Sequence, residues 1–287
     1  MVLSDLEIAW AVRRLMDDMR SCHLGSPFTS DTDFDARIGA LRQVFPDHER
    51  QARAILDQFT RQHAITRRPT SGRGYLLCIT PRSGSSLLAD VLGRTGSIGS
   101  AHEHFRAGEP LSEWMTRCAD LTDCLAALER NAPAGYFGIK GDLFQMFPLI
   151  SDGFFAGPGC IFKHVYLTRR DTLGQAISLA RAVKTNEWHS HDQPVPDPEL
   201  RLEEIVSNLR YIREMEADWE TVFSALRVAP LRLYYEDLIA GPALVFEQVR
   251  QYLDLRWKID PGGIVSEYQS VSGRHDPEWL RKQRSRF

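Results

Sequence analysis

The stretch GYLLCITPRSGSSLLADVLGRTG, residues 74–96, is the segment most informative about the fold. Residues 75–80 are a short uncharged run between a glycine and a proline, which is typical of a strand buried on both faces of a parallel sheet. The polar segment PRSGSS follows at 81–86, and after it leucines and a valine recur at helical spacing until Gly96. The pattern predicts a strand, a tight loop and a helix.

The predicted loop has the features of an anion-binding site. Its backbone N–H groups and the positive end of the helix dipole converge on one point. Arg82 adds a positive charge, and Ser83, Ser85 and Ser86 add hydroxyl donors around Gly84. Small residues are also common in turns that bind nothing, which is the alternative interpretation. The loop is not a Walker loop, because it lacks GxxxxGK[ST] and no lysine follows the glycine.

The composition is that of a soluble globular protein. A chain of 287 residues with 43% hydrophobic side chains fits one large α/β domain, with or without a helical appendage. A net charge of −3 argues against a nucleic-acid partner. The five cysteines are scattered without a CxxC pair, which favours a reducing compartment over disulfides or a metal site. The sequence shows neither a secretory signal nor a run of membrane-spanning length, so we expect a cytoplasmic protein without a transmembrane segment.

The N-terminal quarter predicts helices. Ser4 and Glu7 have capping-box spacing, and apolar residues then recur on one face. We predict a helical N-terminal extension over residues 1–70 and a main domain over residues 71–287. The extension could dock on the main domain, bind a partner or support dimerisation. The helices are expected at 8–19, 34–45 and 52–59.

The rest of the chain alternates strands and helices. Further strands are expected at 136–140, 161–168 and 231–235, and helices at 112–130, 143–150, 171–184, 205–223 and from 242. This alternation predicts an α/β fold with a parallel sheet flanked by helices, which binds ligands at the carboxyl ends of its strands. A turn at 97–105 is expected beside the anion loop. The strand ends carry Arg82, Lys140, Arg169 with Arg170, and Glu236 with Asp237. Three of these four ends are cationic, which predicts a site for more than one phosphate-sized group.

At this point the sequence resembles a known family, the sulfotransferases that use 3′-phosphoadenosine 5′-phosphosulfate (PAPS). It is most similar to the bacterial branch typified by trehalose 2-sulfotransferase. The resemblance covers about residues 74–280, and the segment at 167–188 is the most specific. It implies a P-loop-like sulfotransferase fold, PAPS as co-substrate and a hydroxyl acceptor on a carbohydrate, a glycolipid or another small molecule. The matching segments are TPRSGSSLL at 80–88, AHEHF at 101–105, GIKGDLFQ at 138–145, LTRRDTLGQAISLARAVKTNEW at 167–188, LYYEDL at 233–238 and DPEW at 276–279.

The resemblance assigns donor-binding roles to individual residues. The loop from Arg82 to Ser86 is similar to the family's 5′-phosphosulfate loop, with arginine where many relatives have lysine. Arg169 and Ser178 fall where the family holds the 3′-phosphate, and Arg170 competes with Arg169 because some branches space these residues differently. Arg274 resembles an arginine of a C-terminal loop that reaches the same phosphate.

The resemblance also implies catalytic roles. Glu103 stands where the family has its general base, and a positioned carboxylate accelerates proton removal by roughly 10²–10⁴-fold. His102 and His104 flank it and are alternative bases, since histidine titrates near neutral pH; His104 replaces the branch's usual aromatic residue. Arg82 and Lys140 would stabilise charge on the departing nucleotide. Structurally, Glu103 and Lys140 could instead be an ordinary salt-bridging glutamate and a strand-end cation.

Two other function classes fit parts of the sequence. A P-loop kinase or NTPase would use Glu236 or Asp237 to hold Mg²⁺, but the required loop lysine is absent. A non-catalytic nucleotide-binding adaptor would act through the N-terminal helices. The resemblance is compatible with a homodimer. Trp188 is a candidate for stacking on a sugar face, but the sequence does not identify the acceptor.

Overall fold

In the computed structural model, the chain is described over residues 31–59, 73–106, 113–157, 160–188, 195–256, 261, 264 and 277–287. The helix expected at 8–19 and the candidate ligand residue Arg274 therefore lie outside the described residues.

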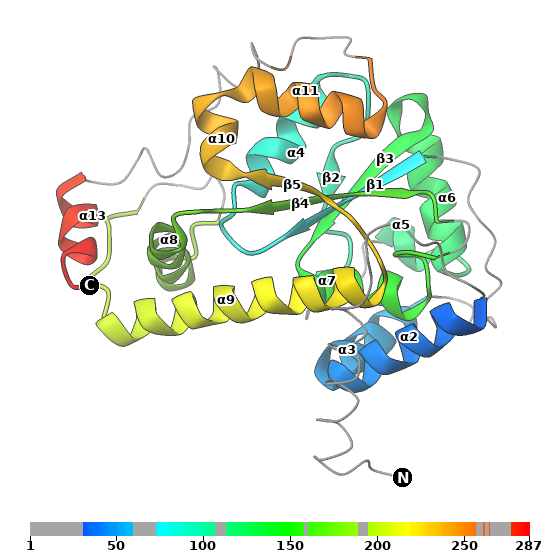
Figure 1. The fold of residues 1–287 in the computed structure, drawn as a ribbon, viewed down its shortest axis with the longest axis horizontal. Helices are drawn as coiled ribbons and strands as arrows, with labels where there is room; N and C mark the ends of the chain where they lie inside the picture. The colour runs from blue at the N-terminus through cyan, green and yellow to red at the C-terminus, as the bar shows by residue number, and fades with distance from the viewer. Residues whose placement is uncertain are drawn as a thin grey trace.

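Five parallel strands of the described chain form one sheet in the order β2-β3-β1-β4-β5 (Figure 1). The strands are β1 (Arg73–Ile79), β2 (Ala101–His102), β3 (Tyr136–Gly141), β4 (Phe162–Thr168) and β5 (Leu231–Tyr234). In the centre, Leu77 of β1 pairs with Lys140 on one side and with Val165 on the other. Because β1 is flanked by two later strands, its carboxyl end lies at the crevice where α/β sheets bind ligands. The predicted parallel α/β sheet is confirmed.

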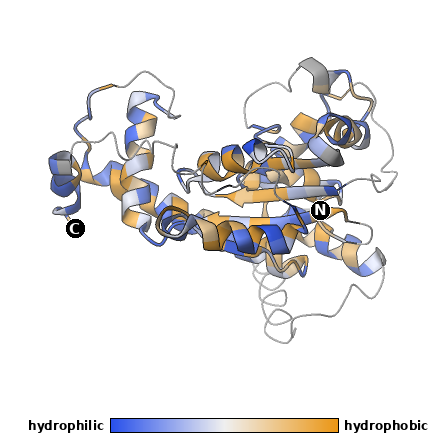
Figure 2. Cartoon of the chain, turned by 90° about the horizontal axis from the view of Figure 1, so that it is seen from above, coloured by the Kyte–Doolittle hydropathy of each residue, from blue (hydrophilic) through white to orange (hydrophobic). Residues whose placement is uncertain are grey.

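The side chains of β1 alternate between two cores. Leu76 and Cys78 belong to the core on one face, and Tyr75, Leu77 and Ile79 to the core on the other. All but Ile79 are completely buried, as expected for a central strand covered on both faces. Figure 2 shows hydrophobic residues concentrated between the sheet and the covering helices.

Helices cover both faces of the sheet, as Figure 1 shows. The first face packs against α7 (Leu143–Ser151) and α9 (Leu202–Ala225), and the second against α4 (Ser85–Arg94) and α11 (Pro242–Leu253). Trp219 of α9 donates a hydrogen bond to the carbonyl of Ile79, 3.0 Å away, directly before the predicted anion loop. The remaining described helices include α5 (Glu113–Thr116), α6 (Leu121–Asn131), α8 (Thr172–Thr185), α10 (Tyr235–Ala240) and α13 (Pro277–Arg284).

The described part of the N-terminal segment packs on the first face of the domain. Phe34 of α2 (Asp31–Val44) is buried in the same core as α7 and α9, and so is Phe45, the residue between α2 and α3 (Pro46–Leu56). The rings of Phe45 and Phe147 lie 6.0 Å apart, and Arg42 donates to the carbonyl of Ser151. These two helices therefore dock on the main domain. The domain boundary at residue 70 stays a prediction.

Two segments differ from the sequence expectation. Ala101 and His102, expected in a turn, form the edge strand β2; a two-residue strand is too short to show a period of two. The helix expected at 112–130 is interrupted between α5 and α6, because the side chain of Asp120 accepts a hydrogen bond from the Asp123 amide and caps a new helix.

Candidate functional site

A cavity of about 430 Å³ opens at the carboxyl ends of the central strands. That volume lies within the range of about 300–1,000 Å³ that is usual for small-molecule sites. Its wall includes the loop after β1, the segment after β2, the amino-terminal part of α7 and the facing sides of α8 and α9. Residues that the sequence analysis took from four separate segments thus meet around one space.

The loop after β1 turns sharply before α4. The Ser83 amide donates to the carbonyl of Thr80 at 3.3 Å. Arg82 and Gly84 both adopt left-handed backbone conformations, with φ of 63° and 90°. A Cβ atom at Gly84 would lie 2.3 Å from the ring of Tyr235, so this position requires glycine for both its conformation and its space. The Ser83 hydroxyl is buried without a hydrogen-bond partner among the described residues, which marks an unsatisfied donor in the loop.

The side chain of Gln175, in α8, holds this loop in place by hydrogen bonds. Its side-chain amide donates to the Thr80 hydroxyl at 2.9 Å and to the Pro81 carbonyl at 2.7 Å, and the residue is completely buried. Sequence reasoning assigned no loop contact to Gln175. Its place in the family-like segment at 167–188 was the only signal.

The predicted phosphosulfate loop and the predicted 3′-phosphate region touch each other. The Arg82 Nε atom donates to the Ser178 hydroxyl at 3.1 Å, and its NH1 donates to the Trp188 carbonyl at 2.5 Å. All three residues line the cavity, together with Gly84, Ser85 and Ser86. Arg82 therefore connects the loop to α8 and to the segment after it.

Arg169 and Arg170 point to different environments. Arg169 lines the cavity with a side chain only 13% exposed, and its guanidinium lies 4.7 Å from the Tyr235 ring centre. Arg170 is exposed and does not line the cavity. It forms a bidentate pair with Asp237 at 2.6 and 2.7 Å and stacks on Tyr234. Of the two arginines, Arg169 is the one placed to meet a ligand there.

Glu103 also lines the cavity and forms the centre of a polar group. Its two carboxylate oxygens lie 3.1 Å from Lys140 Nζ and 3.1 Å from Gln145 Nε2. Burial raises the pKa of Glu103, but the charge of Lys140 and the hydrogen bonds from Gln145 and Lys140 lower it more, so the pKa lies below its usual value. Lys140 also donates to the Ser86 hydroxyl at 3.3 Å and so links Glu103 to the loop.

The orientation of Gln145 is set by a capping box at the start of α7. The side-chain oxygen of Gln145 accepts a hydrogen bond from the backbone amide of Asp142, and the backbone amide of Gln145 donates to the Asp142 carboxylate. The side-chain NH₂ group must therefore face Glu103. The GDLFQ pattern contains this capping box, but the sequence alone did not connect it to Glu103.

The two histidines beside Glu103 do not line the cavity. Their rings lie 6.0 Å apart in an edge-to-face arrangement. Burial and the neighbouring His102 lower the pKa of His104 to about 4, and burial with the charge of Lys140 lowers the pKa of His102. Glu103 is the one of the three candidate bases that faces the cavity.

The remaining wall of the cavity is largely apolar. Leu179, Val183 and Trp188 contribute to it from α8 and beyond, and Tyr211 from α9. Val183 is 62% exposed although it is apolar. Sequence reasoning missed Tyr211 and its neighbour on this wall, Asn208, because periodicity identifies the buried face of a long helix but not which exposed residues reach a cavity.

Within the described ranges, no group of three or more potential metal ligands is found, and no helix is long and apolar enough to cross a membrane.

Comparison of the sequence with known proteins identifies a matching family. The sequence matches the profile of the Stf0 sulphotransferases over residues 74–135 and 154–286. Two relatives named trehalose 2-sulfotransferase are each 24% identical to this chain. The one from Mycobacterium tuberculosis (strain ATCC 35801 / TMC 107 / Erdman) aligns over 74% of this chain and 95% of its own length. The one from Mycolicibacterium smegmatis (strain ATCC 700084 / mc(2)155) aligns over 73% and 94%. The profile match covers the loop after β1, Glu103 and all of α8.

Proposed function

The chain belongs to the Stf0 sulphotransferase family, and from that premise we propose that it transfers a sulfuryl group from PAPS to an acceptor hydroxyl. The observation that carries this proposal is the cavity itself. Its lining includes the loop cation Arg82 with Ser178 and Arg169, and the carboxylate of Glu103. Such a site fits a donor with two separated anionic groups and a hydroxyl that must lose its proton.

The donor side offers the chemistry that PAPS requires. Ser85 and Ser86, which line the cavity, and the amides at the start of α4 form an anion cradle for the 5′-phosphosulfate, whereas the Ser83 hydroxyl is buried and does not line the cavity. Arg169 and Ser178 are proposed to hold the 3′-phosphate. Arg274 stays a further candidate for that phosphate outside the described residues. The bidentate pairing of Arg170 with Asp237 makes Arg170 the weaker candidate.

The catalytic step is an in-line transfer. Glu103 takes the proton of the acceptor hydroxyl, the new S–O bond forms, and the bond from sulfur to the nucleotide's bridging oxygen breaks. The electron pair of that bond leaves with 3′-phosphoadenosine 5′-phosphate (PAP). Lys140 and Arg82 stabilise the negative charge that develops on it. The pKa of Glu103 lies below its usual value, so the side chain is an ionised carboxylate at neutral pH. His104 is the alternative base.

The acceptor class we propose is a carbohydrate or glycolipid hydroxyl, or that of another small molecule. The support is that both relatives are named for trehalose, a sugar. Trp188 and Tyr211 give the cavity aromatic surfaces of the kind on which a sugar ring stacks.

The test is a transfer assay with ³⁵S-labelled PAPS. Trehalose, other sugars, and cell extract with and without its polar lipids serve as acceptors. We expect a labelled product that forms without added Mg²⁺ and is lost in Glu103→Gln. Failure of PAP to bind the protein would contradict the proposed donor.

A further inference from the structure

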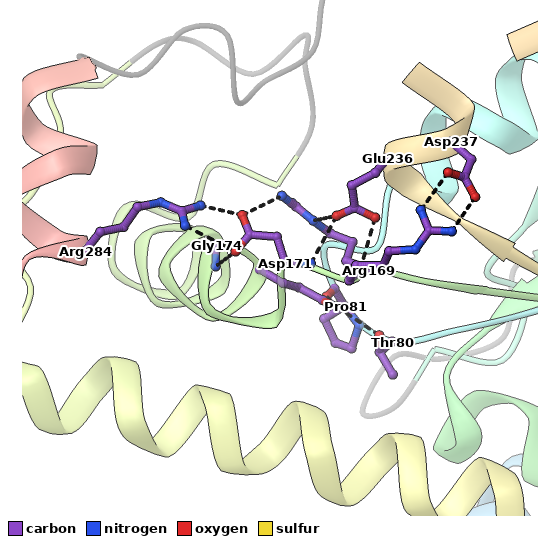
Figure 3. A network of polar contacts seen from close by, with 10 residues as sticks. Thr80, Pro81, Arg169, Asp171, Gly174, Glu236, Asp237 and Arg284 are labelled. Carbon is purple, nitrogen blue, oxygen red and sulfur yellow. Dashed lines mark hydrogen bonds and ion pairs between the residues drawn. The ribbon is translucent and has the colours of Figure 1, made fainter. Parts of the chain in front are cut away.

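Arg169, the proposed 3′-phosphate ligand, lies between two carboxylates without hydrogen-bonding to either. Its Nε is 3.9 Å from a Glu236 oxygen, and its NH2 is 4.0 Å from an Asp171 oxygen. Figure 3 shows Arg169 between these two acids. Both distances exceed the usual hydrogen-bond range of about 2.7–3.2 Å. Among the described residues, the buried Nε has no hydrogen-bond partner. The guanidinium is thus attracted electrostatically by two carboxylates, but neither of them accepts a hydrogen bond from it.

Glu236 directs its oxygens at the backbone instead. One oxygen accepts from the Arg170 amide at 3.1 Å and the other from the Asp171 amide at 3.2 Å. These amides form the turn between β4 and α8, directly after Arg169. Glu236, from the first turn of α10, therefore fixes the backbone that carries Arg169.

Asp171 is also occupied by other partners. Its carboxylate caps α8 by accepting from the Gly174 amide at 3.0 Å, and it receives both terminal nitrogens of Arg284 from α13. In Figure 3, Arg284 approaches Asp171 from the side away from Glu236. The acids beside Arg169 are therefore held by other groups, and Arg169 keeps its distance from them.

The neighbouring Arg170 shows how an arginine binds when an acid pairs directly with its side chain. Arg170 makes two short charge-assisted hydrogen bonds to Asp237, which occupy two of its five N–H donors and leave its charge paired with a carboxylate. Arg169 makes no such hydrogen bond to either of the acids beside it. The difference comes from Glu236 binding the backbone amides, whereas Asp237 binds a side chain.

We infer that Glu236 is a positioning residue of the donor site, which fixes the β4–α8 turn so that Arg169 keeps hydrogen-bond donors for the 3′-phosphate. This inference rests on the proposed function, and it explains why an acid stands beside an anion site. Charge alone gives the opposite expectation, because an acid at that place repels an anionic ligand. Replacing Glu236 should therefore weaken binding of the 3′-phosphate if the residue positions Arg169, and strengthen it if only the charge matters.

The experiment compares the affinities of PAP and adenosine 5′-phosphate by calorimetry. Their ratio isolates the contribution of the 3′-phosphate. In Glu236→Gln we expect this ratio to fall by about tenfold, the size of one lost charge-assisted hydrogen bond. Asp237→Asn is the matched control, since it removes the same charge from the same turn of α10 without touching Arg169; its ratio should stay the same or rise.

A second variant distinguishes the position of the Glu236 carboxylate from its charge. Glu236→Asp keeps the charge but is one methylene too short to hold both amides, and we expect it also to lower the ratio. The inference is overturned if Glu236→Gln behaves like Asp237→Asn, or if Glu236→Asp keeps the original ratio. Arg169→Ala provides the reference. If that variant leaves the ratio unchanged, the proposed 3′-phosphate site itself is wrong, an outcome distinct from failure of Glu236 alone.

Discussion

Replacing Glu103 with glutamine removes the proposed base while keeping the size of the side chain. Proton removal by a positioned carboxylate contributes roughly 10²–10⁴-fold, so kcat should fall by that factor, or about 3–5 kcal/mol of barrier. The amide oxygen of the new residue can keep one of the two 3.1 Å contacts with Lys140 and Gln145, but not both with a full charge. We therefore expect the donor site to persist while the transfer step fails.

The same change has a cost in stability. Lys140 is almost buried, with 9% of its side chain exposed, and would lose its carboxylate partner, whereas Glu103 is 31% exposed. A buried pair that is broken costs about 3–5 kcal/mol and an exposed pair about 0–1 kcal/mol. We expect an intermediate loss of about 1–3 kcal/mol in the free energy of unfolding, measured by urea denaturation.

The assay is steady-state transfer of ³⁵S-labelled sulfuryl groups, with PAP affinity measured by calorimetry as a check on the donor site. His104→Gln is the matched control, and its kcat should stay within about threefold of the original. Glu103 is not the base if Glu103→Gln retains kcat within that margin, or if His104→Gln shows the large loss instead.

Three further predictions concern the loop, the arginine pair and acid stability. Gly84→Ala places a methyl group against Tyr235 at a left-handed position. We expect the loop to shift in order to relieve this strain of about 1–3 kcal/mol, and PAP binding to weaken by about tenfold or more as the loop's donors move; unchanged calorimetric affinity would contradict the loop geometry. Arg169→Ala should weaken PAP binding far more than Arg170→Ala, and equal losses would reject the distinction between them. Burial lowers the pKa of His164 from 6.5 to about 4. The unfolded chain therefore binds its proton first, and stability is fully present above pH 6.5 and lost as the pH falls toward 4. The loss is roughly 3 kcal/mol; His164→Gln should flatten this part of the urea-denaturation profile, and an unchanged slope would count against it.

Much of the fold follows from local sequence patterns. The central strand β1 is an uncharged run because it is buried on both faces, and α9 shows a clear apolar stripe because one face packs on the sheet. The edge strand β2 was missed because two residues carry no period. The break between α5 and α6 depends on Asp120, whose capping role resembles that of many surface acids.

The site was only partly predictable for a related reason. The order of strands along the chain indicates that Arg82, Lys140 and Arg169 share one end of the sheet, which the structure confirms. Which of two adjacent arginines faces the cavity depends on tertiary contacts. Asp237 draws Arg170 outward, and that contact spans 67 positions of sequence. The hydrogen bond from Gln175 to Thr80 in the loop spans 95 positions and has no local sequence pattern.

Calorimetric titration with PAP, adenosine 5′-phosphate, and ATP with Mg²⁺ tests whether this cavity binds the nucleotide of a sulfuryl donor, and it needs no knowledge of the acceptor. We predict that PAP binds without Mg²⁺ and at least about tenfold more tightly than adenosine 5′-phosphate, which lacks the 3′-phosphate. Preferential binding of ATP with Mg²⁺, or equal binding of the two adenosine phosphates, would contradict the account.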